Sequence, residues 1–187
     1  MSYHDFLARK AVMDPPTGLS DLPTLPDALF DFQADIVRWA LRRGRAALFA
    51  GTGLGKTLMA LSWADAIVRA TGQKVLILTP LAVAAQFIRE ADKFGIPAKQ
   101  ARNQGEVEAG VTVTNYEKLE HFDLSAFGGV VLDESSILKA YDGKTRTQLI
   151  DACQQIPYRL AATATPAPND FMELGNHAEF LGVMSYT

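Results

Sequence analysis

The sequence predicts an α/β fold in which helices cover both faces of a mostly parallel sheet. Short apolar segments alternate along the chain with longer segments of helical periodicity. A glycine-rich turn joins one of these predicted strands directly to the helix that follows it. Repeated strand–helix units of this length favour parallel strands, and ligands of such sheets bind beyond the carboxyl ends of the strands.

The elements are expected in the following order. Residues 1–26 contain four prolines and are expected to form an N-terminal arm laid over a domain that spans residues 27–187. Helices are expected at 32–43, 56–70, 81–94 and 145–153, and strands at 46–50, 75–78, 111–114, 130–132 and 159–162. Trp39 and Trp63 fall on apolar helical stripes, so both are expected in the core.

Composition limits the classes of protein to which the chain can belong. The 187 residues are 48% hydrophobic and 21% charged, which is typical of one globular domain, and the single cysteine, Cys153, excludes a disulfide scaffold. There is no apolar run of the roughly 18–20 residues that a membrane helix needs, so we expect no membrane partner and a cytoplasmic location. The net charge of −3 gives no general attraction to nucleic acid, which would have to bind a local patch.

The turn Ala50–Thr57 has the composition of a phosphate-binding loop. Its glycines allow backbone N–H groups to converge on a polyphosphate at the positive end of the following helix. Lys56 can reach the β- and γ-phosphates, and the Thr57 hydroxyl can bind Mg²⁺. A plain strand-to-helix connection is the alternative, but it leaves a cation at a helix N-terminus unexplained. The expected nucleotide-binding residues are Gly51, Thr52, Gly53, Leu54, Gly55, Lys56 and Thr57.

Two carboxylates, Asp133 and Glu134, directly follow a predicted strand. Beside bound phosphates, Asp133 is placed to hold Mg²⁺ and Glu134 to orient and polarise the attacking water. The alternative is a turn in which Asp133 or Ser135 caps a helix.

Thr163 and Thr165 follow the last predicted strand, and their hydroxyls could sense the γ-phosphate or bind the acidic pair. The alternative is an ordinary polar strand end before Pro166.

In this order, the motifs resemble those of superfamily-two helicases and translocases, and within them the Swi/Snf-like branch that includes many DEAD-like phage helicases. Phe32-Gln33 is similar to the Q motif, Ala50–Thr57 to motif I, Leu78-Thr79-Pro80 to motif Ia, Val113–Glu117 to motif Ib, Asp133–Ser136 to motif II and Thr163–Pro166 to motif III. The resemblance spans about residues 29–181.

The resemblance implies a RecA-like P-loop NTPase lobe that uses ATP and Mg²⁺ to drive movement on nucleic acid. Lys56, Asp133 and Glu134 would be the catalytic residues, with Thr57 and Asp133 on the metal. Gln33 would hydrogen-bond adenine. Thr79 and Thr114 would face nucleic-acid phosphates, and Thr163 with Thr165 would couple the two sites.

Two departures from the family pattern qualify these expectations. The acidic motif reads Asp-Glu-Ser-Ser instead of the forms associated with RNA, which favours DNA as the partner. The chain ends at Thr187, where the family continues into a second RecA-like lobe that carries an arginine finger. The chain is therefore expected to be the N-terminal lobe only, binding ATP but hydrolysing it slowly without its second lobe.

Two other functions remain open from the residues alone. One is a P-loop kinase or other small-substrate phosphotransferase, for which no acceptor site is recognisable. The other is a non-catalytic nucleotide-binding module that regulates a partner, against which the intact Glu134 argues. His4, His121 and His177 are scattered without the spacing of metal ligands, so no histidine metal site is expected.

Overall fold

A computed structural model describes residues 15–139, 143–167 and 174–183. Its centre is a six-stranded sheet in the order β1-β6-β5-β2-β4-β3, and every neighbouring pair is parallel. The strands are β1 (Arg45–Phe49), β2 (Val75–Thr79), β3 (Ala98–Gln100), β4 (Val111–Asn115), β5 (Gly129–Asp133) and β6 (Tyr158–Thr163). The predicted α/β fold is confirmed, and the sheet is parallel throughout the described residues.

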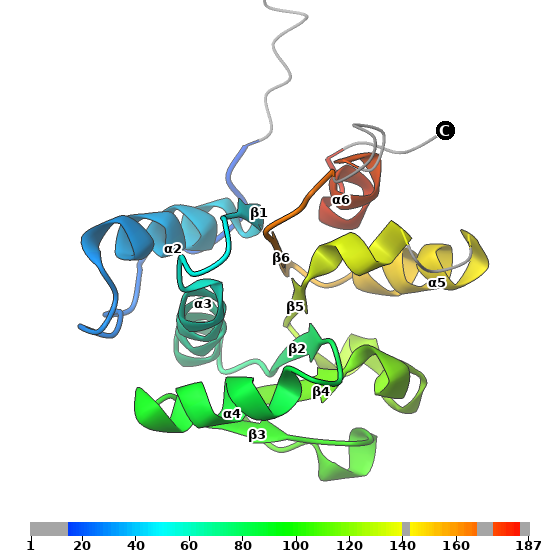
Figure 1. The fold of residues 1–187 in the computed structure, drawn as a ribbon, viewed down its shortest axis with the longest axis horizontal. Coiled ribbons are helices and arrows are strands. Elements are labelled where there is room, and N and C mark those ends of the chain that lie inside the picture. The colour runs from blue at the N-terminus through cyan, green and yellow to red at the C-terminus, as the bar shows by residue number, and fades with distance from the viewer. Residues whose placement is uncertain (1–14, 140–142, 168–173, 184–187) are drawn as a thin grey trace, which may run out of the picture.

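Helices cover both faces of this sheet (Figure 1). One face carries α2 (Asp31–Arg43), α3 (Lys56–Thr71) and α4 (Ala84–Lys93), and the other carries α5 (Gly143–Cys153) and α6 (Leu174–Leu181). Short 3₁₀ segments complete the chain: η1 (Gln104–Glu106), η2 (Tyr116–His121), η3 (Leu124–Ala126) and η4 (Ser135–Lys139). No helix within the described ranges has both the length and the apolar character to cross a membrane.

The strands divide their side chains between two apolar cores, because successive residues of a strand point to opposite faces. On β5, Val131 packs with α2–α4, whereas Val130 and Leu132 pack with α5 and α6. Alternation of this kind in a sheet buried on both faces produces the continuous apolar runs from which the strands are predicted.

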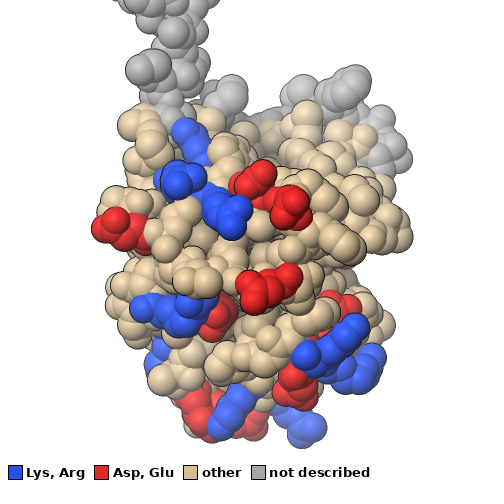
Figure 2. All heavy atoms as spheres, turned by 90° about the vertical axis from the view of Figure 1, so that its left-hand side faces the viewer, with Lys and Arg blue, Asp and Glu red and all other residues tan. Residues whose placement is uncertain are grey.

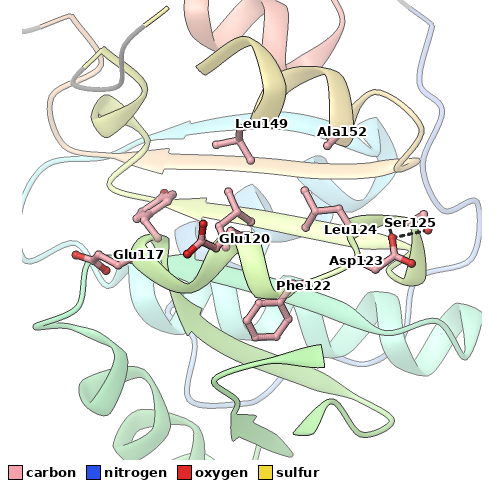
Figure 3. Close-up of a pocket in the computed structure, with 10 residues that line it drawn as sticks. Glu117, Glu120, Phe122, Asp123, Leu124, Ser125, Leu149 and Ala152 are labelled. Atoms are coloured by element: carbon pink, nitrogen blue, oxygen red, sulfur yellow. Dashed lines mark hydrogen bonds between the residues drawn. The ribbon is translucent and has the colours of Figure 1, made fainter. Parts of the chain in front are cut away.

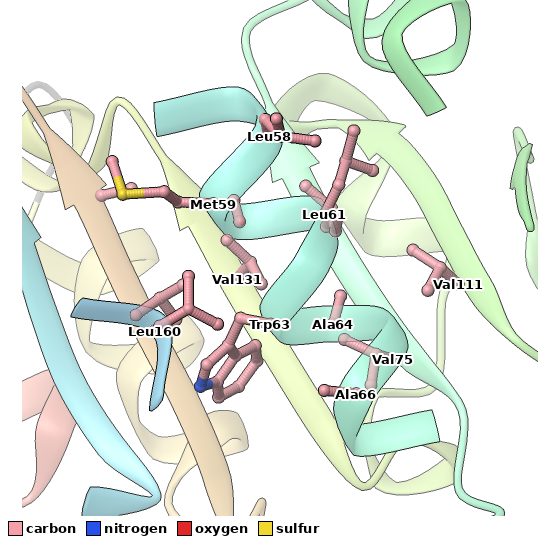
Figure 4. Close-up of a cluster of buried hydrophobic side chains, with 14 of the residues drawn as sticks. Leu58, Met59, Leu61, Trp63, Ala64, Ala66, Val75, Val111, Val131 and Leu160 are labelled. Carbon is pink, nitrogen blue, oxygen red and sulfur yellow. The ribbon is translucent and has the colours of Figure 1, made fainter. Parts of the chain in front are cut away.

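Helix α3 lies in the core between the sheet and helices α2–α4 (Figure 4). Trp63 is fully buried there, as expected, and lies against the sheet near Leu160 and Val131. Trp39 is 50% exposed, so the prediction that it belongs to the core is wrong. The buried stripe of α2 includes Val37 and Ala40, and residue 39 falls on the solvent side of that stripe.

The segment before α2 lies along the end of that helix. The backbone N–H groups of Thr17, Gly18 and Leu19 donate to the carbonyls of residues 43, 42 and 41. A Cβ at Gly18 would lie 1.9 Å from the Leu41 carbonyl oxygen, so only glycine permits this approach. Leucines of the segment, Leu19, Leu22 and Leu25, pack against the core. The boundary between arm and domain at residue 26 stays a prediction.

Three elements differ from expectation. Strand β3 is a short, largely exposed edge strand with little apolar signal, and it is not predicted. Helix α4 begins at Ala84 instead of residue 81, because the residues after Pro80 form a turn in which Leu81 is 64% exposed. Helix α6 is also not predicted. The other boundaries agree within one or two residues.

Candidate nucleotide-binding site

The predicted phosphate loop connects β1 to α3. Gly53 and Gly55 have φ values of +82° and +78°, a region that disfavours residues with a Cβ. Helix α3 begins at Lys56, so the free N–H groups of its first turn border the loop. The Lys56 ammonium donates to the carbonyl oxygens of Ala50 at 3.0 Å and Gly51 at 3.3 Å, so its charge lies over the loop. Together these groups form a cradle with the chemistry that an anion requires.

Gln33 lies against this loop from the start of α2. Its side-chain Oε1 accepts from the Phe30 N–H at 3.0 Å, and its Nε2 donates to the Leu54 carbonyl at 2.9 Å. A Cβ at Gly55 would come within 2.3 Å of Nε2, so the glycine also permits this contact. The structure thus places Gln33 on the loop, and its contact with adenine stays a prediction.

The acidic pair begins at the last residue of β5. Burial raises the pKa of Asp133 to about 6, and the neighbouring Glu134 charge adds to this effect. A hydrogen bond from Thr79 Oγ1 to Asp133 Oδ2 (3.1 Å) and the positive charge of Lys56 act in the opposite direction. The positive charge of Lys56, at the end of the loop, therefore acts on the Asp133 carboxyl.

The residues of this site fit a magnesium ion. A buried carboxylate that is costly to ionise is stabilised by a nearby cation. Mg²⁺ is commonly held by one or two carboxylates together with substrate phosphates, and Asp133 with the Thr57 hydroxyl supplies oxygen ligands of that kind. The described residues contain no cluster of three or more His, Cys, Asp or Glu that would form a separate metal cage.

Thr163 joins the acidic pair to the phosphate loop. Its hydroxyl donates to Glu134 Oε2 at 3.1 Å, and its carbonyl accepts from the Ala50 N–H at 3.2 Å. The backbone N–H of Thr165 donates to the Thr163 hydroxyl at 3.1 Å. The two threonines therefore lie together beside Glu134, and only their role in coupling remains a prediction.

Thr79 and Thr114 are placed differently from expectation. Their residues are 0% and 1% exposed, because β2 and β4 are interior strands covered on both faces. The Thr79 hydroxyl is engaged by Asp133, and the Thr114 hydroxyl has no hydrogen-bond partner among the described residues. Neither hydroxyl reaches the surface, where a nucleic-acid phosphate would lie, so the structure gives no support to that role.

Tyr116 and His177, which the sequence analysis did not place at the site, form hydrogen bonds with residues of the acidic motif. The Tyr116 hydroxyl donates to the Asp133 carbonyl oxygen at 2.7 Å, and His177 Nε2 lies 2.9 Å from Ser135 Oγ. Tyr116 is within the string similar to motif Ib, which offered a weak signal. His177 comes from the unpredicted α6, so no local pattern could have identified it.

A separate hollow of about 680 Å³ opens on the α5 side of the sheet (Figure 3). Its floor is apolar, formed by residues such as Phe122, Leu124 and Leu149, and Glu117, Glu120 and Asp123 line it as well. Carboxylates repel a polyphosphate, and no described residue of the phosphate loop lines the hollow. The hollow is therefore separate from the predicted nucleotide site at the loop.

Charges of both signs are interspersed on the face shown in Figure 2. Arg38 pairs with Asp35 at 2.9 Å and Arg69 with Asp65 at 2.8 Å. Each of these two arginines is therefore paired with a carboxylate of its own helix.

Comparison with known proteins agrees with this geometry. The DEAD/DEAH box helicase family matches residues 30–174. A search of curated proteins finds no match.

Several solved helicase structures share the fold. The SWI2/SNF2 ATPase core of Sulfolobus solfataricus in complex with dsDNA is similar over 83% of this chain and 36% of that chain, with a TM-score of 0.65 and 20% identity. The UvsW helicase from bacteriophage T4 is similar over 99% of this chain and 66% of that chain, with a TM-score of 0.67 and 18% identity. The Hef helicase domain of Pyrococcus furiosus is similar over 85% of this chain and 39% of that chain, with a TM-score of 0.66 and 20% identity. This chain thus spans between about a third and two thirds of these relatives, with the RecA-like fold of one helicase lobe, and it belongs to the DEAD/DEAH box helicase family.

Proposed function

We propose that the chain is the ATP-binding lobe of a nucleic-acid-dependent ATPase of the Swi/Snf-like type, which moves on DNA when joined to a second lobe. The observation that carries this proposal is that the phosphate loop and the Asp133–Glu134 pair meet at one edge of the sheet. They come from different strands, yet Thr163 contacts both. A phosphate cradle beside an acidic pair is the arrangement that γ-phosphate hydrolysis requires.

Each residue of the site has a role in this proposal. The loop N–H groups of residues 51–57 bind the phosphates, and the Lys56 ammonium moves from the loop carbonyls to the β- and γ-oxygens. Thr57 and Asp133 hold Mg²⁺, which neutralises phosphate charge when bound. Glu134 accepts a hydrogen bond from the attacking water and orients it towards the γ-phosphate.

DNA is the proposed partner because of the Asp-Glu-Ser-Ser motif and the likeness to an ATPase core in complex with dsDNA. A second lobe would supply the arginine finger, which contributes roughly 10³–10⁵ to turnover in related enzymes. This lobe alone is therefore expected to bind ATP·Mg²⁺ and to hydrolyse it slowly.

Calorimetric titration with ATP tests the proposal. Binding is expected to require Mg²⁺ for full affinity and to change when duplex DNA is present, with the same factor linking ATP to DNA affinity. Glu134→Gln is expected to retain ATP binding and to lose residual hydrolysis. Absence of ATP binding would refute the proposal, and ATP binding without any linkage to DNA would favour a phosphotransferase.

A further inference from the structure

Glu134 has a strained backbone. Its φ is +51°, and it is the only non-glycine residue with a positive φ among those described. Such a conformation is costly for a residue with a Cβ and persists only where the surrounding structure holds it. We therefore expect the contacts on either side of Glu134 to hold this conformation.

The peptide bond before Glu134 is held by Tyr116. The phenol donates to the Asp133 carbonyl oxygen at 2.7 Å, and both residues are buried. This carbonyl belongs to the planar peptide unit that also contains the Glu134 nitrogen. Fixing the carbonyl direction therefore fixes the plane from which φ of Glu134 is measured.

The residue after Glu134 is held by His177. Ser135 Oγ and His177 Nε2 are 2.9 Å apart, and the two residues are 0% and 3% exposed. The imidazole also packs edge-on against Phe49, with ring centroids 5.2 Å apart, and Phe49 ends the strand that enters the phosphate loop. Helix α6 thus holds the backbone that follows Glu134 and touches the approach to the loop.

We propose that Tyr116 and His177 are positioning residues that clamp the backbone on the two sides of Glu134 and so aim its carboxylate. The aimed carboxylate is the one that accepts from Thr163 Oγ1 at 3.1 Å. The hydrogen bonds described above join the two clamp residues to Asp133 and Ser135 and not to residues 51–57, so we expect each to affect the direction of Glu134 more than phosphate binding. The consequence for hydrolysis rests on the proposed function, whereas the positioning itself does not.

The test uses Tyr116→Phe, which removes only the phenolic oxygen, and His177→Leu. Tyr158→Phe, at the amino end of β6, and His121→Leu, at an exposed residue of η2, are the matched controls. The first measurement is the backbone amide resonance of Glu134 in ¹⁵N-labelled protein. It is expected to shift in both clamp variants and to stay in place in both controls.

The second measurement separates ATP affinity from single-turnover hydrolysis. Both clamp variants are expected to keep ATP affinity within about twofold and to lose about tenfold in the hydrolysis rate, the size expected for one buried hydrogen bond. His177→Gln, which can hydrogen-bond Ser135, is expected to recover most of the rate that His177→Leu loses.

The outcomes distinguish the inference from the function on which it rests. An unchanged Glu134 resonance in both clamp variants overturns the inference, and so does a parallel loss of ATP affinity and thermal stability without recovery in His177→Gln. A shifted resonance in a protein that binds no ATP retains the clamp and rejects the proposed function.

Discussion

Replacing Asp133 with asparagine is expected to stabilise the ligand-free domain above about pH 6. Burial raises the pKa of Asp133 from 3.8 to about 6. Each pKa unit corresponds to about 1.4 kcal/mol, so the ionised carboxylate lowers the free energy of unfolding by about 3 kcal/mol. Because the folded pKa is the higher one, this loss is absent below about pH 4, grows between about pH 4 and pH 6, and is complete above that range.

Asparagine removes the charge and keeps an oxygen that can accept from Thr79. Asp133→Asn is therefore expected to gain about 3 kcal/mol at pH 7.5 and almost nothing at pH 4. For a chain of this size the gain corresponds to a rise in melting temperature of roughly 6–12 °C. The variant is also expected to lose the Mg²⁺ dependence of ATP binding, since it lacks the carboxylate ligand.

Urea unfolding in EDTA at the two pH values measures this difference, with Asp92→Asn on the exposed side of α4 as the matched control. Comparison of variant with wild type cancels the pH effects of all other groups. An equal pH dependence in Asp133→Asn and wild type would show that burial does not disfavour the Asp133 charge. Lower stability of Asp133→Asn at pH 7.5 would refute the reasoning altogether.

Two further substitutions test the phosphate cradle. Lys56→Ala is expected to weaken ATP binding at least about tenfold in calorimetry, since a hydrogen bond to a charged group contributes about 1.5–3 kcal/mol, while Lys93→Ala on α4 should leave affinity unchanged. Gly55→Ala and Gly72→Ala both place a side chain at positive φ (+78° and +70°), but only the former meets Gln33, at 2.3 Å. Gly55→Ala is therefore expected to have a lower melting temperature than Gly72→Ala and to lose ATP affinity. Equal melting temperatures of the two variants would show that the contact between residue 55 and Gln33 does not contribute to stability.

The sequence predicts most of the sheet because each inner strand contains a run of apolar or β-branched residues. Helix α6 escapes prediction because its buried face includes Asn176 and His177, polar residues that conceal the apolar period. Trp39 misleads in the opposite direction, since a large apolar residue can lie on the solvent side of a helix. The hydrophobic pattern of a sequence therefore predicts where a helix lies more reliably than it predicts which of its residues are buried.

Only part of the candidate site could likewise be predicted from the sequence. The phosphate loop and the Asp133–Glu134 pair are visible in the sequence because their chemistry depends on adjacent residues. The contacts made by Tyr116 and His177 depend on segments that meet only in the folded chain. Local spacing carries no information about such contacts, so a structure is needed to find them.

The order of the strands explains how the separate motifs form one site. Four of the motifs lie at the ends of β1, β2, β5 and β6 in that sequence order, but the sheet places these strands as β1-β6-β5-β2. Hydrogen bonds join neighbours in this spatial order. Ala50 donates to Thr163, Thr163 donates to Glu134, and Thr79 donates to Asp133. Strand β6 lies between β1 and β5, and parallel strands bring their carboxyl ends to one edge, so the end of β6 lies between the phosphate loop and the acidic pair. Thr163 therefore contacts Glu134 through its hydroxyl and the start of the phosphate loop through its carbonyl, which is the pattern of contacts that its predicted coupling role requires.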